Sequence, residues 1–260
     1  MGLVINTAKM ALEAGRVSLG VGLRIARPVE VASVMKAAGF DWLFLDLEHG
    51  TMPLDTASQI AAAALTAGIA PLARVPKGEF TMATRLFDNG VQGIVMPHVD
   101  TVAEAREVVK RLRFGPLGHR TSGPLPPQLG FQALSPTEMA AALEPATLIA
   151  VLLESREAIA NVDAISAIDG IDVLMIGTAD LCIEMDIPAQ FTHPAVAAAY
   201  ETVAAACRRH NKWMGMGGIY DEGLIRRYIE LGARFILSGS DLSFLLSAAT
   251  SRARALAAIS

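Results

Sequence analysis

The chain has 260 residues, a formal net charge of −4 at pH 7, and 52% apolar against 18% charged residues. This length fits one large domain or two small ones, and the apolar fraction suffices for a large core and a buried subunit surface. The charge pattern contains no basic stripe, which argues against a nucleic-acid partner. No uninterrupted apolar segment is long enough to span a bilayer, so we expect no membrane association.

Two features of the sequence bear on the cellular compartment. Cys182 and Cys207 are isolated and form no CxxC pair, so neither a disulfide framework nor a thiolate metal site is indicated. Residues 1–6 have no basic region ahead of their short apolar run, which makes them a poor signal peptide. We therefore expect a cytoplasmic protein.

Strand-like and helix-like segments alternate along the chain. A short N-terminal helix is expected within residues 1–16, over 6–14, with Asn6 as its N-cap. Apolar runs predict strands at 17–25, 42–45, 70–73, 93–96, 148–153, 173–176, 213–216 and 235–237. Helical periodicity and capping residues predict helices at 28–38, 54–67, 81–89, 102–112, 136–143, 155–168, 194–210, 221–231 and 242–259.

Eight strand-then-helix units predict one (β/α)8 TIM barrel of the α/β class over residues 1–260. The competing fold is a doubly wound sheet, which needs a glycine-rich dinucleotide turn after its first strand. Gly20 and Gly22 lie inside the first predicted strand instead, and residues 215–218 do not form a GxGxxG motif. We therefore expect no organic cofactor.

Residues 114–136 interrupt the alternation. The segment is rich in glycine and proline and lacks apolar periodicity, which predicts a long loop. Loops of this length in compact domains are often lids or binding loops, so we expect it at the active face.

Polar side chains gather where predicted strands end. In a TIM barrel these ends share one face, on which the chemistry lies. The polar residues at these ends are Asp46, Glu48, His49, Arg74, His98, Glu154, Asp180 and Asp241. The sequence therefore predicts a site in which an arginine, histidines and several carboxylates converge.

Glu154 and Asp180 follow neighbouring strands, with no cysteine or histidine ligand cluster beside them. Two carboxylates suit a hard divalent cation such as Mg²⁺, Mn²⁺ or Co²⁺. For either residue alone, the alternative is a carboxylate that stabilises a helix N-terminus. The pair on adjacent strands favours the metal site.

The other polar residues suggest roles around this cation. Arg74 would stabilise an enolate or an oxyanion, and its alternative role is a salt bridge across the barrel. Residues 177–180 open a helical turn whose N–H groups would bind a substrate carboxylate. His49 is a candidate general acid or base, whereas His98 belongs either to the site or to the start of the next helix. No lysine lies near the catalytic end of a predicted strand, which disfavours a Schiff base.

Several motifs, taken together, resemble one known family. The resemblance is to the HpcH/HpaI aldolase family, whose members are metal-dependent class II pyruvate aldolases. It extends from about residue 17 to the last predicted helix. The segments that carry it are 39–42, 46–49, 88–90, 154–158 and 177–181, together with Arg74 and Pro97.

The resemblance implies a TIM barrel in a homohexamer, built as a trimer of dimers, whose last helix swaps onto a neighbour. It implies Glu154 and Asp180 as metal ligands, with pyruvate chelating the metal. The backbone N–H of Ala179, within the segment Gly177, Thr178, Ala179 and Asp180, would bind the pyruvate carboxylate.

The resemblance also implies roles for the remaining site residues. Arg74 would hold the enolate oxygen. His49 would exchange the proton of the aldol hydroxyl, and Asp88 from an adjacent subunit would raise the basicity of His49. Asp46 would support either His49 or the waters of the metal.

Two positions and one loop depart from the family pattern. Leu152 stands where the family often has a glutamine that contacts pyruvate, and Thr178 stands where it usually has proline. Arg120 matches a recurrent arginine of the family, but the loop that follows it does not continue in the usual way. These departures bear mainly on substrate specificity.

The expected reaction is reversible aldol cleavage of a 4-hydroxy-2-oxo acid to pyruvate and an aldehyde. One alternative is a related metal-enolate lyase or decarboxylase acting on oxaloacetate or on a citrate-lyase-type acyl-CoA. Another is a non-catalytic barrel that binds a keto acid.

Overall fold

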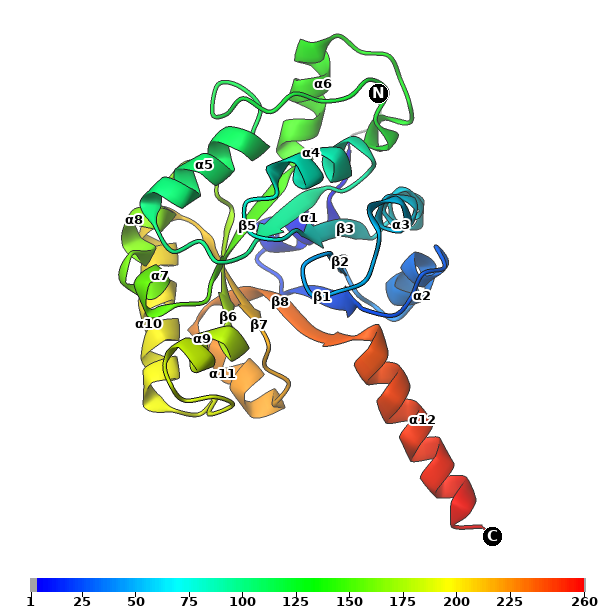
Figure 1. Cartoon of the computed structure of the whole chain (residues 1–260), viewed down its shortest axis with the longest axis vertical. Helices are drawn as coiled ribbons and strands as arrows, with labels where there is room; N and C mark the ends of the chain where they lie inside the picture. Colours follow the sequence, from blue (N-terminus) through cyan, green and yellow to red (C-terminus); the bar gives the residue numbers. More distant parts are fainter. Residues whose placement is uncertain (1–3, 260) are drawn as a thin grey trace.

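Eight parallel strands close into a barrel in the computed structural model, which describes residues 4–259 (Figure 1). The strands are β1 (Ser18–Leu23), β2 (Trp42–Asp46), β3 (Ala70–Arg74), β4 (Gly93–Met96), β5 (Leu148–Leu153), β6 (Val173–Gly177), β7 (Trp213–Gly217) and β8 (Ala233–Ser240). Each strand pairs with the next one in the chain, and β8 pairs with β1 to close the ring. The TIM barrel that the sequence predicts is confirmed.

Helices surround this barrel. They are α1 (Thr7–Glu13), α2 (Val31–Ala37), α3 (Leu54–Ala67), α4 (Phe80–Asp88), α5 (Val102–Leu112), α6 (Pro136–Leu143), α7 (Arg156–Ala160), α8 (Val162–Ser166), α9 (Thr178–Glu184), α10 (Pro194–His210), α11 (Glu222–Leu231) and α12 (Asp241–Ala257), with 3₁₀ turns η1 (Pro127–Leu129) and η2 (Glu144–Ala146). The bounds of α5, α6 and α10 agree with the prediction to the residue. The helix predicted over 155–168 is instead the pair α7 and α8, which meet at Asn161. There the Asn161 amide donates to the carbonyl of Asp100 at 2.9 Å.

Apolar side chains fill the barrel interior. Trp42 stacks on Phe235 with their ring centroids 4.1 Å apart, and both rings are fully buried. The N-terminal helix α1 packs Ala8 and Leu12 against this cluster. As predicted, Asn6 caps α1, because its side chain accepts the N–H of the third helical residue at 3.1 Å. The interior is therefore a packed core, closed at one end by α1.

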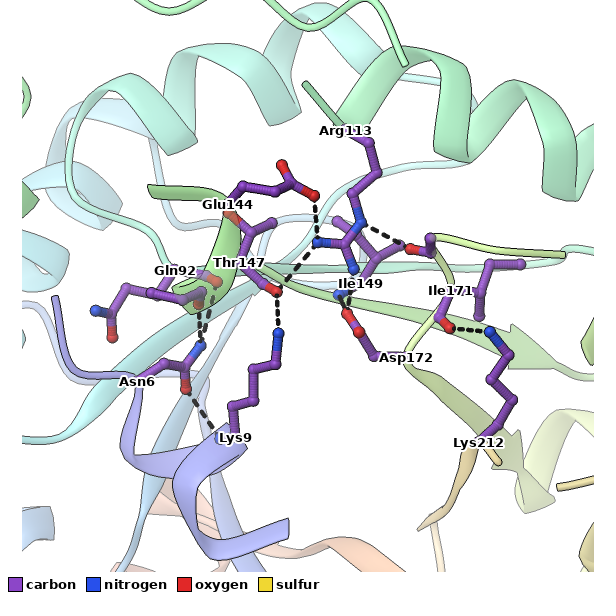
Figure 2. A network of polar contacts seen from close by, with 12 residues as sticks. Asn6, Lys9, Gln92, Arg113, Glu144, Thr147, Ile149, Ile171, Asp172 and Lys212 are labelled. Carbon is purple, nitrogen blue, oxygen red and sulfur yellow. Dashed lines mark hydrogen bonds and ion pairs between the residues drawn. The ribbon is translucent and has the colours of Figure 1, made fainter. Parts of the chain in front are cut away.

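A polar network lies at the same end of the barrel (Figure 2). The buried Arg113 is ion-paired with Glu144 at 2.9 Å and with Asp172. Its guanidinium and the ammonium group of Lys9 each donate to the carbonyl oxygen of Thr147 at 3.3 Å. Thr147 precedes β5 and Asp172 precedes β6, so the network marks the N-terminal ends of the strands.

The long loop lies at this N-terminal end, so the expectation that residues 114–136 cover the active face is wrong for the fold of one chain. Gln128 donates to the carbonyl oxygens of Phe87 at 2.6 Å and Val91 at 3.0 Å, just before β4 begins. Arg120 stacks on the ring of Phe87 at 3.9 Å. The reason is connectivity: a loop that follows α5 and precedes β5 must lie where strands begin.

The last helix, α12, projects away from the barrel (Figure 1). Phe244 anchors its start by stacking on Phe40, with the ring centroids 6.0 Å apart. Farther along, Leu245 and Leu246 are 59% and 63% exposed. None of the helices within residues 4–259 is both long and apolar enough to cross a membrane.

The packing of β1 against Trp42 generates a stability prediction. A Cβ atom added to Gly20 would lie 2.2 Å from the indole ring, whereas a Cβ at Gly22 would meet its nearest atom at 3.5 Å. Because overpacking a core costs about 1–3 kcal/mol, Gly20→Ala should lower the free energy of unfolding by at least that amount. The Gly22→Ala control should change it much less. Equal losses in urea denaturation of both variants would contradict this account of the core.

Candidate active site

The C-terminal ends of β2 and β3 are joined by a buried ion pair between Asp46 and Arg74. The two residues are direct partners in the strand register. Arg74 Nε lies 3.0 Å from Asp46 Oδ1 and Nη2 lies 2.7 Å from Oδ2, a two-pronged arrangement. Burial alone would raise the pKa of Asp46, but the hydrogen bonds and charge of Arg74 hold that pKa below its usual value. The pair is therefore ionised and fixed.

Glu48 adds a second carboxylate to Arg74. Its Oε2 lies 3.1 Å from Nη1 of Arg74, which is only 7% exposed. The sequence leaves a salt bridge across the barrel as the alternative role of Arg74, and the structure gives Arg74 two carboxylate partners, Asp46 and Glu48. The sequence places Glu48 among the converging polar residues but assigns it no role in the site.

His49 lies at the mouth of the site. Its backbone N–H and that of Glu48 both donate to Asp46 Oδ1 at 3.2 Å, so the same carboxylate that binds Arg74 shapes this turn. The imidazole is half-exposed, and its Nε2 lies 3.9 Å from Glu48 Oε2. The residue lines the same cavity as Arg74, which is where a general acid or base must lie.

The structure brings Glu154 and Asp180 together, as predicted. Glu154 follows β5 and is 2% exposed, Asp180 lies in α9, and both line one cavity. Burial, and to a lesser degree the negative charge of Asp180, raises the pKa of Glu154 to about 7, against the opposing effect of His98 and Arg74. The two carboxylates therefore act on each other electrostatically.

His98, which the sequence leaves undecided, belongs to the site. Its backbone N–H donates to Glu154 Oε2 at 3.0 Å, and its Nδ1 lies 3.2 Å from the same oxygen. Its Nε2 lies 3.8 Å from Glu48 Oε1, so the ring stands between two carboxylates. The backbone has a φ of 51°, a left-handed conformation that is uncommon outside glycine and recurs at functional sites.

Two glycines make room where β6 turns into α9. A Cβ at Gly177 would lie 2.5 Å from Glu154 Oε1. Gly218 has a φ of 84°, and a Cβ there would lie 3.3 Å from the backbone nitrogen of Ala179. A side chain at Gly177 would crowd Glu154, the candidate metal ligand. A side chain at Gly218 would crowd the N–H groups that begin α9.

Thr178 contributes only its backbone to this turn. Its hydroxyl is fully buried and bonds to the Gly217 carbonyl and the Tyr200 hydroxyl, each at 2.8 Å. The N–H groups of Thr178 and Ala179 begin α9, where no intrahelical acceptor exists for them. These N–H groups are the donors that the sequence predicts for a substrate carboxylate.

The residues to which the sequence assigns a role in catalysis, substrate binding or metal binding, apart from Asp88, line a cavity of about 370 Å³ at the C-terminal ends of the strands. Glu48, His98 and Asp241 do not line this cavity. The polar side chains of the cavity stand above an apolar floor. Leu152 is part of this floor and is buried, so it offers the cavity no polar contact where the family often has an amide. The floor residues that line the cavity are Phe44, Leu152, Met175 and Leu237.

Asp88 is not brought to the site within one chain. It ends α4, beside the long loop, and a Cβ at Gly123 would lie 3.3 Å from its Oδ2. Its Oδ1 is buried and has no hydrogen-bond partner within residues 4–259. The end of α4 faces the N-terminal end of the barrel, away from His49.

The carboxylate pair fits a hard divalent cation. Among the described residues, no group of three or more His, Cys, Asp or Glu side chains is arranged to hold a metal, so Glu154 and Asp180 would supply the protein ligands as a pair. Mg²⁺ accepts such sites because it keeps several waters, whose positions substrate oxygens take over. The mutual repulsion that helps raise the pKa of Glu154 is what a bound cation relieves.

Comparisons with known proteins identify the family of the chain. The chain is 38% identical over 258 residues to a 4-hydroxy-4-methyl-2-oxoglutarate aldolase of Hapsidospora irregularis, covering 98% of this chain and 96% of that protein. It is 35% identical to a hydroxypyruvate/pyruvate aldolase of Pseudomonas aeruginosa, with coverages of 95% and 91%. The crystal structure of an HpcH/HpaI aldolase from Desulfitobacterium hafniense DCB-2 matches with a TM-score of 0.91 at 25% identity, covering 97% of each chain. Residues 26–248 match the model of the HpcH/HpaI aldolase/citrate lyase family, and the chain belongs to that family.

Proposed function

We propose that this protein is a divalent-metal-dependent aldolase that reversibly cleaves a 4-hydroxy-2-oxo acid to pyruvate and a second carbonyl compound. The observation that carries the proposal is the arrangement of one cavity, in which the Glu154–Asp180 pair faces an arginine fixed by two carboxylates. The aldolase names of the relatives at 35% and 38% identity support the same reaction class.

Glu154 and Asp180 would hold the cation, with Mg²⁺, Mn²⁺ and Co²⁺ as candidates. When bound, such an ion withdraws electron density from the keto oxygen of the substrate. The charge of the site would attract this cation. Four carboxylates and two guanidinium groups lie in or beside the cavity: Asp46, Glu48, Glu154, Asp180, Arg24 and Arg74. With the histidines neutral, the formal charge of −2 matches one divalent cation.

Arg74 would stabilise the charge that develops on the substrate. Asp46 binds the Nε and Nη2 groups of its guanidinium and Glu48 lies beside Nη1, so its position is set before substrate arrives. Fixed donors stabilise an enolate oxygen without the cost of reorganising solvent. Asp46 is thus proposed to position Arg74 and the His49 turn, rather than to bind the waters of the metal.

His49 would act as the general base of cleavage. It takes the proton of the 4-hydroxyl group, the bond between carbons 3 and 4 breaks, and carbon 4 becomes a carbonyl. The electron pair of that bond forms the pyruvate enolate, which takes a proton at carbon 3. The backbone N–H groups of Thr178 and Ala179, between Gly177 and Asp180, would orient the substrate carboxylate.

We propose a homohexamer, arranged as a trimer of dimers, in which α12 packs on a neighbouring subunit. The exposed Leu245 and Leu246 on this projecting helix support association. Asp88 cannot reach His49 of its own chain, so its proposed role in raising the basicity of His49 requires an adjacent subunit. The unpartnered Oδ1 of Asp88 within the described residues fits that role.

The proposed cytoplasmic location rests on the cysteines. Cys182 and Cys207 are both buried and unpaired. Burial raises the pKa of each thiol, so neither is a reactive thiolate at neutral pH.

Exchange of the pyruvate methyl protons in D₂O tests the proposal directly. With Mg²⁺, Mn²⁺ or Co²⁺ we expect exchange that a chelator abolishes and fresh metal restores. A panel of aldehydes and keto acids then distinguishes aldol addition from decarboxylation of oxaloacetate, and from use of acyl-CoA. Absence of exchange with every metal would rule out the proposed function and favour a non-catalytic barrel.

Arg74→Lys tests the role of the fixed guanidinium. The lysine keeps the charge but loses the two-pronged contact with Asp46, and loss of one fixed oxyanion donor lowers kcat by about 100-fold or more. Arg111→Lys, at an exposed position on α5, is the matched control and should retain full activity. Wild-type kcat in Arg74→Lys would contradict the assigned role.

The raised pKa of Glu154 predicts that the free energy of unfolding of the metal-free protein decreases as pH rises. Between the unfolded value of 4.5 and the folded value of about 7, the folded state holds a proton that the unfolded state releases, so this contribution to stability falls as pH rises. At pH 8, Glu154→Gln should therefore be more stable than wild type by up to about 3 kcal/mol. Below pH 4 the advantage should disappear.

Urea denaturation in the presence of a chelator measures this difference. Glu157→Gln, an exposed position on α7, is the control and should show no comparable pH dependence. A difference between Glu154→Gln and wild type that is constant from pH 4 to pH 8 would show that Glu154 titrates normally.

A further inference from the structure

The two oxygens of the Glu154 carboxylate have different neighbours. Oε1 lies against the end of β6, because a Cβ atom added at Gly177 would be 2.5 Å from it. Oε2 contacts His98, whose backbone N–H donates to it at 3.0 Å and whose imidazole Nδ1 lies 3.2 Å away. One oxygen therefore faces the turn that leads to Asp180, and the other is held by His98.

Two cavities share the carboxylate pair. Gly177 lines the active-site cavity, and His98 lines a second cavity of about 480 Å³. Glu154 and Asp180 line both of these cavities. His98 thus contacts Glu154 without lining the cavity that the substrate would occupy. A role for His98 in the reaction must therefore act through Glu154.

His98 is itself held on the other side of its ring. Nε2 lies 3.8 Å from Oε1 of Glu48, and Oε2 of Glu48 lies 3.1 Å from the buried Arg74 guanidinium. The backbone of His98 has a φ of 51°, which is unfavourable for a residue with a Cβ atom and persists only where the surrounding structure fixes it. The imidazole is therefore placed against Glu154 by contacts at both of its nitrogens.

We propose that His98 is a positioning residue that makes Glu154 bind the cation through Oε1 alone, and that it thereby selects Mg²⁺ over Ca²⁺. The proposal rests on the metal-dependent function proposed above. His98 occupies Oε2, so Oε1 remains as the ligand atom. Mg²⁺ requires compact, near-octahedral coordination, which single carboxylate oxygens and waters satisfy. Ca²⁺ is larger, takes more oxygens and accepts both oxygens of one carboxylate, so holding Oε2 disfavours it.

Two substitutions at position 98 separate the imidazole from the backbone. His98→Gly removes the ring, and glycine adopts a left-handed φ without strain. His98→Asn also tolerates this φ, and its side-chain amide returns an N–H donor close to the position of Nδ1. Competition against Mn²⁺, followed by the electron paramagnetic resonance signal of the free ion, gives the Kd values of Mg²⁺ and Ca²⁺ for each protein.

We expect the wild type to bind Mg²⁺ more tightly than Ca²⁺. Loss of a residue that orients a metal ligand lowers metal affinity by about 10- to 100-fold, so the Kd of Mg²⁺ should rise by about 10-fold or more in His98→Gly. The Kd of Ca²⁺ should change little, because Glu154 can then offer both oxygens. His98→Asn should restore most of the preference for Mg²⁺. A general loss of structure would instead weaken the binding of both cations equally.

His210→Gly is the matched control. His210 ends α10, and its Nε2 lies 3.0 Å from Oδ1 of Asp163, so this variant also removes an imidazole next to a carboxylate. Neither residue lines the two cavities that share Glu154 and Asp180, so both Kd values should stay at the wild-type level. Circular dichroism and thermal unfolding establish that each variant is folded.

A wild type that binds Ca²⁺ as tightly as Mg²⁺, or a folded His98→Gly with the wild-type ratio of the two Kd values, would overturn the proposal. Wild type that binds neither cation would overturn it together with the metal site. Exchange of pyruvate methyl protons by the Mg²⁺-loaded wild type is measured in parallel. If that exchange occurs while the ratio in His98→Gly is unchanged, this proposal alone is wrong, so the two failures are distinguishable.

Discussion

The buried contact of Arg74 with Asp46 and Glu48 sets the geometry of the whole site. A guanidinium that is 7% exposed has lost most of its water, and an unpaired charge in that position would cost several kcal/mol. Two carboxylates compensate it, and both come from the end of β2 and the turn after it. Asp46 also accepts the N–H groups of Glu48 and His49. The Asp46 carboxylate therefore fixes the Arg74 guanidinium and the backbone of the turn that carries Glu48 and His49.

This network extends to the proposed metal ligands through His98. The imidazole lies between Glu48 and Glu154, at 3.8 Å and 3.2 Å, so the carboxylates after β2 and β5 share one neighbour. Arg74 and Arg24 thus compensate the negative charges of Asp46 and Glu48. The Glu154–Asp180 pair, in contrast, carries an excess of negative charge. A divalent cation relieves that excess. A cation held by Glu154 and Asp180 would withdraw electron density from the keto oxygen, and Arg74 would stabilise the same enolate.

Much of this architecture follows from the sequence, for a definite physical reason. Apolar runs and helix caps identify the alternating elements, and parallel strands of a barrel all end on one face, so Glu154 and Asp180 converge without any knowledge of side-chain packing. The partners of Arg74 and the position of His98 depend on turn geometry after strand ends, which short patterns do not encode. The composition of the loop 114–136 resembles that of a lid, which is why composition alone predicts it at the active face. Its position after a helix, rather than after a strand, is the signal that places it at the other end of the barrel.

The central claim is that Glu154 and Asp180 together hold one divalent cation. Titration with Mn²⁺, followed by the electron paramagnetic resonance signal of the free ion, measures this most directly. The account predicts one Mn²⁺ per chain in the wild type, displaced by Mg²⁺, and a large loss of affinity in both Glu154→Gln and Asp180→Asn, with Glu157→Gln unchanged. Wild-type Mn²⁺ affinity in either site variant would contradict it.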